Sequence, residues 1–212
     1  MEFSFDGIGS AAQSMSPAAI PTGHNNKGFF KRALMNLFII AFMFGFVELY
    51  TFCLGSGNGL IGLTISLAII SFWRTDIGIK PLQGAFVIWG SFLLTGGATF
   101  LASFHPAIGV FVNFASIYII LTLTSHQPMA KAYYPILSCY LFAQSSPVYG
   151  IDYGLRMIGI AGGGLIVAII YYMRHRKVKR RRNITDIFRE THFCSIRTKF
   201  FIRLTTGLTI AM

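Results

Sequence analysis

The chain has 212 residues, of which 54% are hydrophobic, 15% aromatic and 12% charged, and its formal net charge is +11. Soluble domains carry about 25% charged residues, so this composition argues against an ordinary water-soluble domain and against a disordered class. The apolar residues come in long uncharged blocks, which is the pattern of membrane spans. The three cysteines, Cys53, Cys139 and Cys194, lie far apart and predict neither a disulfide framework nor a metal site.

Six apolar blocks predict an all-α, polytopic transmembrane bundle over residues 29–173, after a loose polar tail at 1–28. We expect the spans at Leu34–Leu54, Leu60–Trp73, 82–104, 107–125, 132–149 and Tyr153–Met173. The fifth block is the weakest, because Pro135 and Pro147 limit its unbroken part to Ile136–Ser146. Such a short segment is also compatible with a re-entrant helix.

The distribution of basic residues predicts the topology of this bundle. With six spans, every Lys and Arg outside the spans falls on one side of the membrane, and the opposite loops at 55–59, 105–106 and 147–152 contain none. The positive-inside rule then places both ends of the chain in the cytoplasm. Residues 174–198 become a basic cytoplasmic linker that we expect to contact anionic lipid headgroups rather than nucleic acid. Its candidate lipid contacts are Arg174, Arg176, Lys177, Lys179, Arg180, Arg181 and Arg182.

The last residues of the chain repeat the sequence that begins the first span. The aligned residues Phe200, Phe201, Arg203, Leu208 and Ile210 match Phe29, Phe30, Arg32, Leu37 and Ile39 without a gap. Residues 204–212 form about 14 Å of helix, which cannot cross about 30 Å of hydrocarbon. Residues 199–212 are therefore predicted to begin a second, truncated transmembrane repeat. The alternative is a short amphipathic segment that lies flat at the interface.

Two charged residues lie inside predicted spans, Glu48 in the first and Arg156 in the sixth. Each costs about 3 kcal/mol on insertion scales and therefore requires a partner or a function. A structural ion pair, or an Arg156 that reaches toward the headgroups, is one interpretation. In the other, Arg156 is the counter-charge for an anionic substrate and Glu48 takes part in proton coupling.

Uncharged polar residues and glycines within the spans supply further candidates. Asn113 and Gln144 are expected to form hydrogen bonds between helices or to line the substrate or proton path. Gly159 and Gly163 form a GxxxG pair in the sixth span, which favours close helix packing, with a flexible gating point as the alternative. The motifs GxSxG, HExxH and GxxxxGK[ST] are absent. We therefore expect no enzyme activity, no cofactor and no metal.

The layout resembles the FUSC family, the fusaric acid resistance and aromatic acid exporter proteins. The similar features are the start FFKRALMNLF, six closely spaced spans, and a last span GLRMIGIAGGGLIVAII that opens with an arginine followed by glycines. The resemblance covers residues 28–212, corresponds to the first of two six-span halves, and implies an inner (plasma) membrane protein that exports aromatic carboxylate anions. A second half or a second copy, as a homodimer, would complete the path. The alternatives are a non-catalytic membrane scaffold or assembly protein, and an anion channel.

Overall fold

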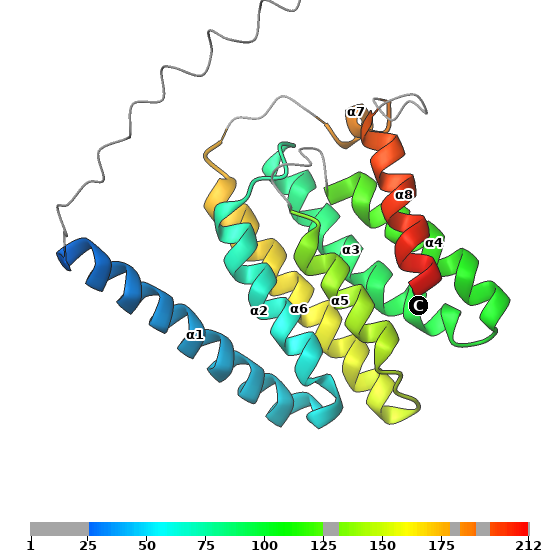
Figure 1. Ribbon diagram of the computed structural model, residues 1–212, viewed down its shortest axis with the longest axis horizontal. Helices are drawn as coiled ribbons and strands as arrows, with labels where there is room; N and C mark the ends of the chain where they lie inside the picture. The colour runs from blue at the N-terminus through cyan, green and yellow to red at the C-terminus, as the bar shows by residue number, and fades with distance from the viewer. Residues whose placement is uncertain (1–25, 125–131, 179–182, 190–195, 212) are drawn as a thin grey trace, which may run out of the picture. The chain divides into compact units, whose positions relative to one another are not determined.

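The computed structural model describes residues 26–124, 132–178, 183–189 and 196–211, and within these ranges every regular element is a helix (Figure 1). The elements are α1 (Asn26–Leu54), the short 3-10 helix η1 (Ser56–Asn58), α2 (Gly59–Arg74), α3 (Pro81–Ala102), α4 (Pro106–Thr124), α5 (Tyr134–Ser145), α6 (Ile151–His175), α7 (Ile184–Arg189) and α8 (Ile196–Ala211). The chain divides into two compact units, residues 1–39 and 40–212. The predicted all-α class is confirmed.

Within the residues that the structure describes, five helical segments are long and apolar enough to cross a membrane. They are Phe30–Leu54, Ser56–Arg74, Pro81–Ala102, Pro106–Thr124 and Ile151–His175, and each overlaps a predicted span. Pro81 and Pro106 each stand at the first position of their helix, where a missing amide hydrogen costs nothing. The chain thus has the helices of a multi-pass membrane protein.

The fifth predicted span is shorter than the others. Helix α5 has 12 residues, about 18 Å of helix, against the roughly 20 residues that a full crossing needs. It is nevertheless central, because Ile136, Cys139 and Tyr140 are fully buried and α5 packs against α2 and α3.

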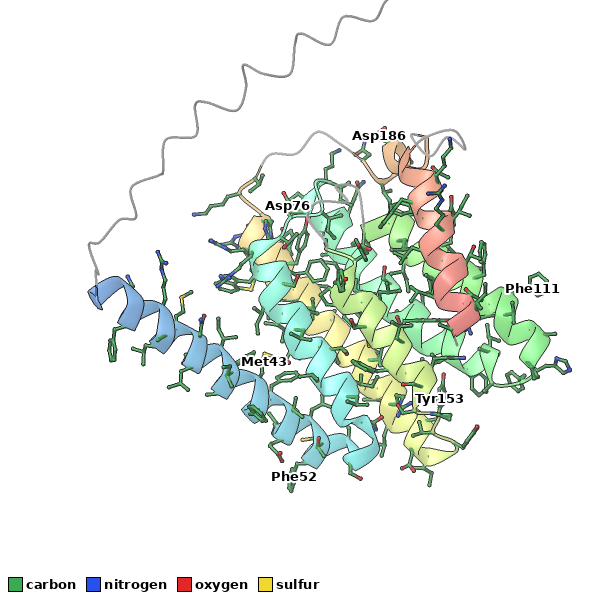
Figure 2. The ribbon with its side chains drawn as sticks, viewed as in Figure 1. Met43, Phe52, Asp76, Phe111, Tyr153 and Asp186 are labelled. Carbon is green, nitrogen blue, oxygen red and sulfur yellow. The ribbon has the colours of Figure 1, made fainter. Side chains whose placement is uncertain are left out.

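The outer surface of residues 40–212 is largely apolar. Phe111 on α4 and Phe52 on α1 are 78% and 88% exposed, and both point away from the neighbouring helices (Figure 2). Large exposed apolar surfaces are unusual for soluble monomers. Lipid tails are as apolar as these side chains, so such a surface is compatible with a helix bundle in a bilayer.

Glycines on α6 let the neighbouring helices approach closely. A Cβ atom on Gly159 would overlap the Tyr50 hydroxyl, and one on Gly163 would overlap the Ile65 side chain. On Gly164 it would lie 2.6 Å from the Cβ atom of Phe92, closer than real Cβ contacts come. The GxxxG pair and its neighbour therefore lie where α6 meets α1, α2 and α3.

The C-terminal segment forms a helix that covers α4. Helix α8 packs against α4, with Phe201 and Thr205 buried and with Leu204 and Leu208 partly buried against the core. Whether residues 199–212 begin a second repeat stays a prediction. Residues 1–25 of the expected tail, residues 179–182 and 190–195 of the expected linker, and Met212 lie outside the described residues.

Candidate functional site

A cavity of about 420 Å³ opens where α3 and α5 end and α6 begins, and we call it the Arg156 cavity. Its apolar and aromatic wall consists of Phe100, Ala143, Pro147, Val148, Tyr149, Gly150 and Tyr153, and its polar lining of Thr99, Ser103, Gln144 and Arg156. Small-molecule pockets typically measure roughly 300–1,000 Å³ and combine apolar walls with few polar groups. The Arg156 cavity has both properties.

Arg156 lies in the second turn of α6 and is only 2% exposed. Its Nε donates a hydrogen bond to Asn58 Oδ1 at 2.8 Å, and Nη2 donates to the Gly57 carbonyl at 2.9 Å. Nη1 donates to the carbonyls of Ala143, at 3.3 Å, and Ser146. Nη2 also lies 3.5 Å from the Ser146 hydroxyl. A guanidinium has five N–H donors, so these five contacts satisfy all of them.

The chain builds this set of acceptors from two turns and a helix end. Gly55 and Gly150 have φ values of 91° and 62°, a region that glycine enters without steric cost, and they direct the chain into η1 and α6. Pro147 stands four residues after Ala143 and has no N–H, so the Ala143 carbonyl lacks its helical donor. Arg156 supplies that donor and places a positive charge at the C-terminal end of α5, where the helix dipole is negative.

All of these hydrogen-bond partners of Arg156 are neutral, so none of them balances its positive charge. Every acceptor is a backbone carbonyl, an amide oxygen or a hydroxyl. Glu48 is exposed on α1 and is not among the hydrogen-bond partners of Arg156. The structure therefore does not bring together the two charged residues that the sequence singled out. A buried cation with hydrogen-bonded but neutral partners creates a positive potential in the cavity.

The other predicted site residues divide into two groups. Gln144 lines the Arg156 cavity. Asn113 on α4 is buried elsewhere and accepts a hydrogen bond of 2.6 Å from the Tyr140 hydroxyl on α5. Of the predicted lipid contacts, Arg174, Arg176 and Lys177 are exposed at the end of α6, whereas Lys179, Arg180, Arg181 and Arg182 lie outside the described residues.

Sequence reasoning missed several residues of the site. Tyr153 stacks on Phe100, with ring centroids 5.0 Å apart, and donates a hydrogen bond to the Gly96 carbonyl at 3.1 Å. Asn58 belongs to the GSGNG segment, which the sequence indicates only as a break between spans. Residues 57–62 also match the pattern GxGxxG. That pattern binds dinucleotides where it connects a strand to a helix, and here it connects two helices.

Comparison with known proteins found no matching family model, no matching curated protein and no matching solved structure. The resemblance to the FUSC family therefore stays a prediction.

Proposed function

We propose that this multi-pass membrane protein exports small aromatic carboxylate anions across the inner (plasma) membrane and that the Arg156 cavity is its anion site. The observation that carries the proposal is a buried arginine with only neutral partners on the wall of an aromatic cavity. Such a site favours a ligand with an aromatic ring and at least one carboxylate. The resemblance to aromatic acid exporters agrees with this choice of ligand.

The cavity offers each part of such a ligand a matching contact. Phe100 and Tyr153 present stacked rings, and aromatic pairs contribute about 0.5–1.5 kcal/mol beyond their buried area. The contact between Arg156 Nη2 and the Ser146 hydroxyl, at 3.5 Å, is the longest of the five. A carboxylate oxygen can replace that hydroxyl and gain a charge-assisted hydrogen bond, while the other four contacts keep the guanidinium in place.

The proposed topology places this cavity on the side opposite the basic residues. We infer that α5, with its flanking turns, completes a sixth passage through the membrane, so that both ends are cytoplasmic. The Arg156 cavity then faces the outside and corresponds to an exit site for export. A second copy of the chain, or a second half, would complete the path toward the cytoplasm. Glu48 lies apart from Arg156 and lines no part of the cavity, so the anion site is proposed without it.

A flux assay on the purified protein in liposomes tests the proposal. The substrate is labelled phthalate, an anionic aromatic carboxylate, and protein-free liposomes measure its leak. Val148→Trp fills the cavity, whereas Ile169→Trp adds the same ring on α6 at a residue that is 48% exposed. We expect phthalate flux for the wild type and Ile169→Trp, and loss of flux for Val148→Trp at equal protein content.

The assay also separates the alternatives. Flux that requires an imposed proton gradient supports an exporter, and flux that does not require one would indicate an anion channel. Absence of flux from the wild-type chain, tested both alone and as a homodimer, would contradict transport and favour the scaffold. Equal flux from Val148→Trp and Ile169→Trp would contradict the assignment of the Arg156 cavity.

A further inference from the structure

A second charged site lies at the other end of the bundle, where α2 ends beside the last turn of α6. Two hollows flank Trp73 there. One, of about 600 Å³, is lined by Trp73, Arg74, Arg174, His175 and Val178. The other, of about 440 Å³, is lined by Trp73, Ile170, Met173, Arg174, Arg176 and Lys177. Trp73 and Arg174 are shared by both hollows, and we call this region the Trp73 groove.

One cation of the Trp73 groove, Arg174, and its neighbour His175 both contact aromatic side chains. The guanidinium carbon of Arg174 lies 5.6 Å from the centroid of the Trp73 ring, within the range of a cation–π contact. His175 next to it is buried, packs on the Tyr171 ring and contacts the Tyr171 carbonyl. The Tyr171 hydroxyl in turn donates to Asp76 Oδ1 at 2.8 Å, at the start of the α2–α3 loop (Figure 2).

The groove carries more positive charge than the two helix ends require. Every charged Lys, Arg, Asp or Glu residue that lines the two hollows is basic: Arg74, Arg174, Arg176 and Lys177. The C-termini of α2 and α6 together contribute about one negative charge, and the Asp76 carboxylate, bonded to Tyr171 beside the groove, contributes one more. About two of the four positive charges then remain. The surplus favours a ligand with more than one negative charge.

The position and lining of the groove indicate where that ligand comes from. Trp73 lies one residue before the end of a helix that is long and apolar enough to span a membrane, and a tryptophan at such a place is typical of the membrane–water interface. Ile170 and Met173 extend the apolar side of the groove along α6, toward the hydrocarbon. A ligand with an apolar tail and a compact, multiply charged phosphate head therefore matches the groove better than a soluble ion does.

We propose that the Trp73 groove is a binding site for a phosphate-monoester phospholipid, with phosphatidic acid as its simplest representative. The phosphate monoester carries about 1.5 to 2 negative charges at neutral pH and bonds to Arg74 and Arg174, while the glycerol and the upper acyl chain lie against Trp73 and Met173. This goes beyond general attraction of a basic tail to anionic lipid, because it names a groove and predicts a preference for headgroup chemistry.

Trp73 provides its own probe. The chain has two tryptophans, so Trp89→Phe leaves Trp73 as the only indole. We would reconstitute this variant in phosphatidylcholine vesicles and measure quenching of its fluorescence by phosphatidic acid or phosphatidylserine brominated near the headgroup end of the acyl chain. The two lipids are compared at equal total charge. The chain with both tryptophans, in which Trp89 adds a constant background, provides the same comparison if Trp89→Phe does not fold.

Removing single basic side chains inside and outside the groove distinguishes a specific lipid site from a generally basic surface. Arg74→Gln and Arg174→Gln remove cations of the groove, and Lys80→Gln removes one from the exposed end of the α2–α3 loop, outside both hollows. A basic residue near an anionic surface contributes about fivefold in affinity without regard to headgroup. We expect phosphatidic acid to quench at about tenfold lower total lipid charge than phosphatidylserine. Arg74→Gln and Arg174→Gln should abolish that preference, and Lys80→Gln should retain it.

Three results would overturn the proposal. Equal quenching by the two lipids would mean that only surface charge attracts lipid. Loss of the preference in Lys80→Gln to the same extent as in Arg174→Gln would mean that the groove is not the site. Displacement of the brominated lipid by millimolar inorganic phosphate would assign the groove to a soluble phosphate rather than to a lipid.

Discussion

Asn58 offers the sharpest test of the uncompensated charge in the Arg156 cavity, because its amide oxygen accepts the Arg156 Nε–H at 2.8 Å and its amide nitrogen donates to the Leu54 carbonyl at 2.7 Å. Asn58→Asp replaces a neutral acceptor with a carboxylate of nearly the same shape. At 4 Å two opposite charges attract by about 4 kcal/mol at an effective dielectric constant of about 20. The new carboxylate therefore competes directly with any anion that Arg156 would attract.

The effect of Asn58→Asp on stability should be small. The cost of burying the new carboxylate offsets most of its attraction to Arg156, so the charged hydrogen bond gains only about 1 kcal/mol over the neutral one. Loss of the bond to Leu54 costs about the same. Asn58→Ala removes both bonds and leaves a buried, charged N–H without its acceptor, at a cost of about 3 kcal/mol. Comparison of the two variants therefore separates an effect on folding from an effect on the charge beside Arg156.

We would measure the affinity of the purified protein for benzoate and its unfolding in mild detergent. For Asn58→Asp we expect near wild-type unfolding with benzoate affinity lowered at least tenfold, equivalent to about 1.4 kcal/mol. For Asn58→Ala we expect earlier unfolding. Wild-type benzoate affinity in a folded Asn58→Asp variant would refute the role assigned to Arg156, and wild-type stability of Asn58→Ala would refute the hydrogen-bonded clamp around it.

Three further predictions concern the packing that holds the bundle together. Gly164→Ala should lower the unfolding free energy by about 1–3 kcal/mol, because its Cβ would meet the Cβ atom of Phe92 at 2.6 Å. Gly162→Ala, with nothing within 4 Å of its Cβ, should not destabilise the protein. Equal unfolding of the two variants would contradict the close approach of α3 and α6. Tyr140→Phe removes the hydrogen bond to Asn113 and should cost about 0.6 kcal/mol, up to about 1.7; a double-mutant cycle with Asn113→Leu that shows no coupling would disprove that contact. Tyr171→Phe removes the hydroxyl that donates to Asp76. The Gly78 amide donates to the same carboxylate oxygen at 3.0 Å, and its hydrogen exchange should become faster in this variant. Unchanged exchange would show that Tyr171 does not hold the loop.

Hydropathy and proline predicted where several helices begin or end, but not where the first one begins. Helix α1 starts at Asn26, inside the expected loose tail at 1–28 and eight residues before Leu34. The block that ends at Leu54 ends there in the structure, since Gly55 turns the chain. The helices expected to start at 82 and 107 each start one residue earlier, at Pro81 and Pro106, because proline is well accommodated at the first position of a helix. The expected weakness of the fifth block is also borne out in its length. Pro147 prevents α5 from continuing, and its unbroken part, expected at Ile136–Ser146, corresponds closely to Tyr134–Ser145.

The contacts of Arg156 could not be read from the sequence. Its partners Asn58 and Gly57 are 98 and 99 residues away along the chain, and they lie in a segment whose composition indicates only a turn. A charged residue in a span suggests an oppositely charged partner, and Glu48 is the one acidic residue that lies inside a predicted span. The structure instead satisfies Arg156 with carbonyls exposed by a proline and by a helix end, an arrangement that depends on tertiary packing.

The most direct test of an anion site at Arg156 is to compare the binding of benzoate and its neutral analogue benzamide to the purified wild-type protein by equilibrium dialysis. We predict that benzoate binds at least tenfold more tightly, since the two ligands share a ring and differ in charge. We also predict that Val148→Trp abolishes binding while Ile169→Trp does not. Equal affinity for the two ligands, or binding that Val148→Trp leaves intact, would contradict an anion site in the Arg156 cavity.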